Sequence, residues 1–190
     1  MEDISLHLLD IIENSVQANA RNIDMIIVID KGKNRLSIKI VDNGEGMDEE
    51  TLERAQQPFF TTKVARKKKI GLGIPLFKQN AEQCEGFFVM SSSPGKGTII
   101  DTEFMLDHLD RMPLGNIADT FLTSILGHPD VDYRLEYSCL DGSTNKNFVF
   151  DTAEIRKELG EEIPLNYPDV IGFIREMLTE GILDVYVEKH

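Results

Sequence analysis

Apolar residues divide the first hundred positions into short elements. At helical spacing they recur at Ile4, Leu8, Ile11, Ile12 and Val16, which predicts a helix over 4–18 with one buried face. Residues 23–29 and 36–41 are apolar, β-branched runs joined by a polar turn, the signature of a hairpin. The other predicted elements are helices over 48–57 and 74–84 and strands over 87–90 and 98–105. This succession predicts the α+β class: a two-layer α/β sandwich with a mixed, largely antiparallel sheet.

The pattern lapses over 107–115, a polar stretch that contains proline and glycine. We therefore predict a first domain over 1–106 and a small α/β extension over 107–190. In the extension we expect helices over 116–126, 152–159 and 168–180 and strands near 133–139, 148–151 and 182–187. The extension carries no recognisable chemical motif, and its role stays open.

Composition narrows the class of protein. Hydrophobic residues make up 41% and charged residues 28%, as in soluble globular proteins. A net charge of -13 disfavours nucleic-acid binding, which needs clustered Lys and Arg. No apolar run approaches the roughly 20 residues of a membrane helix, so we expect a cytoplasmic protein that does not bind membranes. Cys84 and Cys139 suggest free thiols used in packing.

Four blocks of polar and glycine residues lie within the predicted elements or beside their ends. In chain order they are Glu13-Asn14-Ser15, Asp42 to Gly46, Lys69 to Gly73 and Ser93 to Thr98. A nucleotide site needs a group that reads the base, a group that holds magnesium, and backbone donors for the phosphates. One glycine pair alone is weak evidence, because glycine serves any turn with positive φ. The four blocks together predict an ATP site.

The first two blocks offer side chains for the base and the metal. Asp42, at the end of a strand, can accept a hydrogen bond from an exocyclic amine, and Gly44 and Gly46 let the backbone approach the ring. The alternative is a turn in which the aspartate and glycines serve geometry alone. The amide oxygen of Asn14 suits Mg²⁺, although a structural asparagine is the alternative.

His7 and Asp10 share a helix face with Asn14. They are candidate catalytic residues, because an imidazole or carboxylate there could orient or deprotonate the group that attacks the γ-phosphate. For His7 the competing interpretation is a packed or surface histidine. Glu13 lies off this face, and we expect it to be structural.

Gly71 and Gly73 precede the predicted helix at 74–84. Free backbone N–H groups and the helix dipole would therefore point at phosphate oxygens. A basic cluster lies just before them, in a segment over 61–70 that would form a lid, with Lys63 offsetting phosphate charge. A solvated loop is the alternative for this cluster.

These blocks resemble the Bergerat-fold ATPases, which include DNA gyrase, MutL, heat-shock chaperones and histidine kinases. The resemblance covers residues 1–106. Around residues 58–63 it is closest to histidine kinases, and around Asn14 it is closer to MutL. It implies ATP with Mg²⁺ held by Asn14, and adenine read by Asp42 and Thr98. It also implies phosphates bound under the lid by Thr62, Lys63, Gly71, Leu72 and Gly73.

Two departures from the family pattern bear on activity. Hydrolysing members carry Glu four residues before the Asn, whereas this chain has Asp10, which is shorter by roughly 1.5 Å. A displacement of that size can cost on the order of 10²-fold in rate, so hydrolysis stays open. Neither His108 nor His128 has a recognisable phosphoacceptor context. We therefore predict transfer of the γ-phosphate to an unidentified partner protein; the alternatives are a nucleotide-gated binding switch without chemistry and a slow ATPase.

Overall fold

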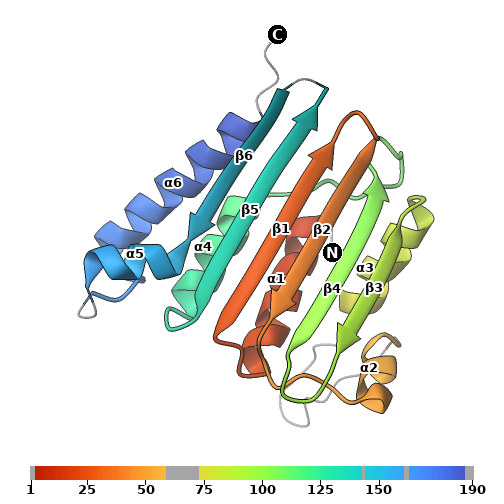
Figure 1. The fold of residues 1–190 in the computed structure, drawn as a ribbon, viewed down its shortest axis with the longest axis horizontal. Helices are drawn as coiled ribbons and strands as arrows, with labels where there is room; N and C mark the ends of the chain where they lie inside the picture. The colour runs from red at the N-terminus through yellow and green to blue at the C-terminus, as the bar shows by residue number, and fades with distance from the viewer. Residues whose placement is uncertain (1–2, 59–72, 143, 161–162, 187–190) are drawn as a thin grey trace.

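The protein consists of one mixed β-sheet with helices layered on one face (Figure 1). The computed structural model describes residues 3–58, 73–142, 144–160 and 163–186. The elements, in chain order, are α1 (Ile4–Gln17), β1 (Asn22–Asp30), β2 (Arg35–Asp42), α2 (Glu49–Ala55), α3 (Gly73–Gln83), β3 (Phe87–Ser92), β4 (Thr98–Met105), α4 (Ile117–Gly127), β5 (Asp132–Asp141), β6 (Thr144–Asp151), α5 (Thr152–Leu159) and α6 (Pro168–Tyr186).

The strands follow the order β3-β4-β2-β1-β5-β6. Only the β1–β5 pair is parallel among these strands, and the other four pairs are antiparallel. The predicted α+β class with a mixed, largely antiparallel sheet is therefore confirmed. In the β2–β4 register, Asp42 lies opposite Thr98. Two residues that the sequence assigned to base recognition thus meet at one end of the sheet.

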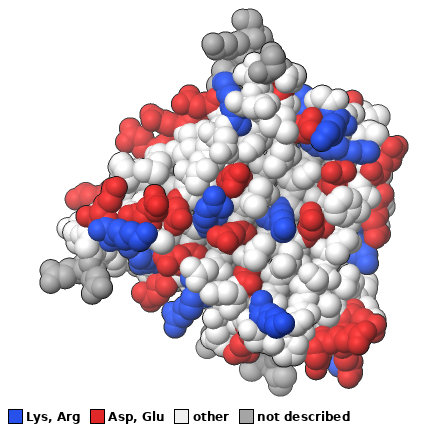
Figure 2. Space-filling model, in the orientation of Figure 1, with Lys and Arg blue, Asp and Glu red and all other residues white. Residues whose placement is uncertain are grey.

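Strict alternation of side chains separates the two faces of the sheet. On β1 every second residue from Ile23 to Ile29 is buried, and β2 and β5 show the same period of two. These inward side chains pack against the apolar face of α1, where Ile4, Leu8 and Ile12 are fully buried. None of the described helices covers the opposite face of the sheet, and charges of both signs are scattered over it (Figure 2).

The chain beyond residue 106 continues the same sheet. β5 lies parallel to β1 with nine paired positions, from Asn22 opposite Asp132 to Asp30 opposite Leu140. The segment before α4 also reaches the start of α1, since the N–H groups of Ile4 and Ser5 donate to carbonyls of residues 113 and 114, each at 2.9 Å. The extension is therefore hydrogen-bonded to the first hundred residues at both α1 and β1. A division into two domains at residue 106 stays a prediction.

The strand predicted over 182–187 is wrong for residues 182–186, because α6 continues to Tyr186. The apolar residues over 182–187 suggested a strand, but burial follows a helical period. Leu178 and Val185, two turns apart on one face of α6, are both buried. Gly181 brings the helix close to the ring of Phe148 on β6. Tertiary packing thus decides the local structure here.

The two glycines of α6 give a matched test of this packing. A Cβ at Gly181 would overlap the Phe148 ring, whereas a Cβ at Gly172 meets no atom within 4 Å. We expect Gly181→Ala to lower the free energy of unfolding by about 1–3 kcal/mol through overpacking. Gly172→Ala should raise it by up to about 1 kcal/mol, because alanine favours helix. Urea denaturation measures both, and equal stabilisation by the two changes would contradict the close contact at Gly181.

Candidate functional site

The carboxylate of Asp42 lies at the end of β2 and is only 7% exposed. One oxygen, Oδ2, accepts a hydrogen bond from Ser15 Oγ at 2.8 Å. The other, Oδ1, accepts from the backbone N–H groups of Gly44 at 2.9 Å and Thr98 at 3.2 Å. A buried carboxylate is stable only when it is hydrogen-bonded in this way. Helix α1, the turn after β2 and strand β4 therefore converge on a single side chain.

The two glycine turns predicted from the sequence pack against each other beside Asp42. Gly46 and Gly97 both have positive φ, at 68° and 76°. A side chain at Gly46 would overlap the carbonyl of Ser93, and one at Gly97 would overlap the carbonyl of Asp42. Both positions thus require glycine for conformation and for space. Glycines at these positions leave the backbone bare at this end of the sheet, as a planar base needs.

Asn14 lies on α1 directly before Ser15 and is half-buried. Within the described residues its amide side chain has no hydrogen-bond partner. One turn earlier, Asp10 lies against Gly73, the first residue of α3, where any Cβ would overlap its carboxylate. The side chains of Asn14 and Asp10 are therefore free to meet a ligand placed between α1 and the start of α3.

His7 is 2% exposed and is held from two sides. Its ring stacks on Phe77, with centroids 5.2 Å apart. Its Nδ1 lies 3.1 Å from the carbonyl oxygen of Gly73. Because a carbonyl can only accept, Nδ1 carries the proton and donates. Burial lowers the pKa of His7, so the ring is neutral at pH 7. The imidazole thereby fixes the first residue of α3.

A cavity of about 240 Å³ opens beside His7 on the outer side of the helical layer. It is lined by His7, Leu76, Gln79, Asn80, Gln83 and Met112. Asn80 holds one wall in place, since its amide donates to the carbonyl of Asp110 at 3.0 Å.

Five of the predicted site residues lie on α1 or contact it: His7, Asp10, Asn14, Asp42 and Gly73. Thr98, Gly44 and Gly46 join them through Asp42 and the glycine turns.

The remaining predicted site residues lie outside the described ranges. These are Thr62, Lys63, Gly71 and Leu72, together with the expected lid over 61–70. Glu13, which we expected to be structural, lies 3.1 Å from Nε2 of His128 at the end of α4. That contact joins α1 to the extension, one residue away from Asn14.

Sequence reasoning did not assign a role to Ser15 or Ser92. Ser15 Oγ donates to Asp42, and Ser92 Oγ donates to the carbonyl of Gly97 at 2.7 Å and accepts from the N–H of Met47 at 2.8 Å. Ser92 therefore fastens the two glycine turns together. The only signal for Ser15 was its place beside Asn14, and no pattern singled out Ser92.

The family of histidine kinase-, DNA gyrase B- and HSP90-like ATPases matches residues 2–108, more than half of the chain. The chain belongs to this family. Its first part is therefore an ATP-binding domain of the Bergerat type, as the four motif blocks predicted. The N-terminal domain of a DNA repair protein shares the fold, with a TM-score of 0.51 at 16% identity over 78% of this chain and 52% of that one.

Curated relatives match the same region. A putative sensor protein of Shewanella frigidimarina is 34% identical over 104 residues, which are 54% of this chain and 16% of the relative. Sporulation kinase A of Bacillus subtilis is 30% identical over 50% of this chain and 15% of its own. An anti-sigma F factor of Thermoanaerobacter is 31% identical over 35% of this chain and 42% of its own. The matched region thus spans less than half of each of these relatives.

Ser15→Ala tests whether the hydrogen bond to Asp42 serves nucleotide binding. A hydrogen bond to a charged group contributes about 1.5–3 kcal/mol, so its loss should weaken ATP binding by about tenfold or more. Ser91→Ala, on the exposed side of β3, is the matched control and should leave binding unchanged. Isothermal titration with a non-hydrolysable ATP analogue and Mg²⁺ gives the affinity. A thermal melt shows whether each variant is folded, and unchanged affinity in folded Ser15→Ala would remove Asp42 from the binding site.

Proposed function

We propose that the protein binds ATP with Mg²⁺ and transfers the γ-phosphate to a partner protein in the cytoplasm. The observation that carries this proposal is that described residues of motif blocks far apart in sequence meet at α1. Asp42 reaches Ser15 on one turn of the helix, and Gly73 reaches Asp10 and His7 nearer its start. The residues that we assign to the base and those that we assign to the phosphates thus contact the same helix. Within the described ranges, no helix combines the length and apolar character that a membrane span requires.

The described residues fit a magnesium ion that is shared with phosphates. Among them no group of three or more His, Cys, Asp or Glu side chains could hold a metal alone. Asn14 instead offers one hard amide oxygen for which the described residues supply no partner, and Mg²⁺ commonly takes its other ligands from water and substrate phosphates. When bound, the ion would neutralise charge on the phosphate oxygens. Asn14 would hold it, and Asp42 would accept a hydrogen bond from the adenine amine.

Around the phosphates, the chain supplies position and proton transfer. The first N–H groups of α3 lack partners within their own helix and are suited to phosphate oxygens. His7 keeps Gly73 in place through its carbonyl. Asp10, in contact with Gly73, would accept the proton of the attacking group. We propose that Lys63 adds positive charge from the lid.

The second candidate is a nucleotide-gated switch that binds a partner without chemistry. Asp10 in place of glutamate favours it, because the shorter side chain disfavours hydrolysis by water. The match to anti-sigma F factors, whose name describes binding to another protein, supports a protein partner for either function. A slow ATPase is the third candidate.

Asn14→Ala offers the first test of chemistry. With γ-labelled ATP and Mg²⁺ we expect the wild-type protein to release label, to phosphate or to protein, and Asn14→Ala to lose that release at least about 10²-fold. Asn145→Ala, on the exposed side of β6, is the matched control. Label that stays on bound ATP, even when candidate partners are added, would leave only the switch.

Asp10 separates transfer from hydrolysis. Asp10→Asn keeps the size of the side chain but removes its basicity, so it should retain ATP affinity and lose release of label. Asp10→Glu should raise hydrolysis if reach is the limit. Brisk ATPase activity of the wild-type protein without any partner would contradict the transfer proposal.

A further inference from the structure

The two outer edges of the sheet differ in how they are protected. β6, at one end of the sheet, carries Lys146 and exposed Thr144, Asn145 and Asn147. β3, at the other end, has the sequence Phe-Phe-Val-Met-Ser-Ser, with neither proline nor a charged side chain. Natural edge strands are blunted by charge, proline, bulges or a cover, because their free backbone groups pair with other strands. In the described part of the chain, no further strand pairs with β3.

Apolar side chains accompany this unprotected edge. Phe87 is 42% exposed and Val89 is 55% exposed, both on the face of the sheet that the helices leave open. Ile99 on β4, diagonal to Val89 in the register, is 39% exposed and extends the apolar surface inward. A strand added along β3 would place every second side chain against these residues.

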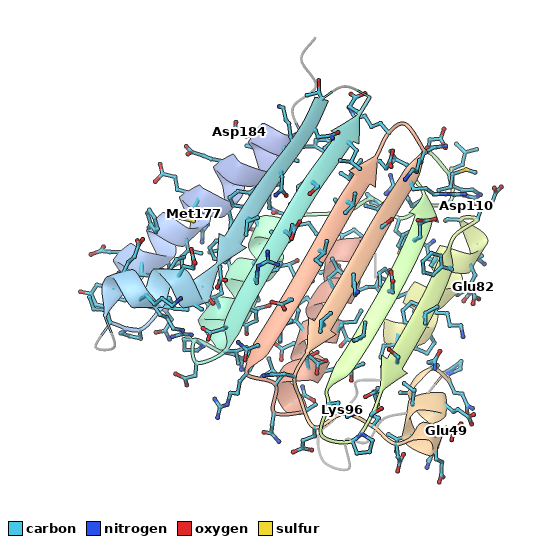
Figure 3. The ribbon with its side chains drawn as sticks, in the orientation of Figure 1. Glu49, Glu82, Lys96, Asp110, Met177 and Asp184 are labelled. Atoms are coloured by element: carbon cyan, nitrogen blue, oxygen red, sulfur yellow. The ribbon has the colours of Figure 1, made fainter. Side chains whose placement is uncertain are left out.

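Acidic side chains flank the β3 edge at both ends. Exposed Glu82 and Glu85 precede β3, and exposed Glu49 lies on α2, which packs beside the strand. Figure 3 shows Glu82 and Glu49 at opposite ends of the side of the molecule that carries β3. In Figure 2, red side chains gather along this side, over α2 most densely. Asp101, opposite Val89 on one side and Lys39 of β2 on the other, adds a further carboxylate beside the apolar surface.

Among the described residues, two cations near β3 have partners within the molecule. Lys78 on α3 donates to the amide oxygen of Gln56 at 3.4 Å, and Arg54 lies 3.8 Å from Glu50. Lys96 lies in the turn between β3 and β4. Among the described residues, the exposed side chains at the two ends of β3 are therefore mainly acidic.

From these features we infer that β3 is a docking edge for an extended segment of another protein, with alternating apolar residues and Lys or Arg at both ends. Its backbone would continue the sheet, its apolar side chains would cover Val89 and Phe87, and its basic ends would meet the flanking acids. Charge decides against a second copy of this chain. An antiparallel pair of β3 strands would bring the acidic start of one edge beside the acidic end of the other. This inference does not depend on ATP chemistry.

Defined peptides test the inference on the full chain. The probe is a fluorescent peptide of alternating valine and threonine with lysines at both ends. We expect it to bind, to protect β3 amides from hydrogen exchange, and to leave β6 amides unchanged. Two control peptides should bind with an affinity at least about tenfold lower. One has the same core with glutamates at its ends, and the other is the basic peptide with alternate amides N-methylated.

Two sets of variants locate the binding edge. Val89→Lys adds a charge at an exposed position of β3 and should abolish binding, whereas Val149→Lys, at an exposed position of β6, should not. Glu82→Lys combined with Glu85→Lys should weaken the basic peptide and strengthen the acidic one, a result that a folding defect cannot produce. No binding of the basic peptide, equal binding of the acidic peptide, or binding that survives Val89→Lys would each overturn the inference. Self-association of the wild-type chain that Val89→Lys removes would also overturn it, in favour of a second copy.

Discussion

The buried carboxylate of Asp42 is the constraint around which the candidate site is arranged. Its oxygens need donors in a place that water barely reaches, and those donors come from Ser15 on α1, Gly44 in the turn and Thr98 on β4. A charge in such a place is tolerated only with this complete set of partners. Satisfying one side chain therefore fixes how α1 lies on the sheet and how the two glycine turns meet. The position of Asn14 follows, because it is the neighbour of Ser15.

Local rules account for most of what the sequence predicted correctly. Apolar, β-branched runs joined by a turn identified β1 and β2, and alternation identified β4, because each strand has one buried face and one open face. Helical spacing identified α1 for the same reason. The final strand was mispredicted because the short run after Gly181 is rich in apolar residues, whereas the packing of α6 on β6 imposes a helix. A short apolar run is compatible with a strand and with a helix, so the local sequence pattern alone cannot decide between them.

Candidate site residues could be proposed from the sequence only where the residue types and order of a motif indicate a particular chemistry. Asp42, Asn14 and the glycines were assigned to the candidate site because their types and order are specific. The sequence analysis assigned His7 a catalytic role. Its stacking on Phe77 and its hydrogen bond to Gly73 also give it a positioning role. That role could not be predicted, because both contacts are with α3, which begins far along the chain. Ser92 was missed because a serine that ties two turns together has no sequence signature. The pairing of β5 with β1 was not predicted either, because the sequence of a strand does not specify which other strand it pairs with.

That pairing has a consequence for how the protein is made. Pairings between distant segments form late, because the chain between them must first be ordered. During synthesis β1, β2 and α1 leave the ribosome long before β5, so one edge of β1, in which every second residue is buried in the folded protein, has no partner strand during that time. The nascent chain thus passes through a stage that is prone to aggregation, and it leaves that stage only when residue 141 has emerged.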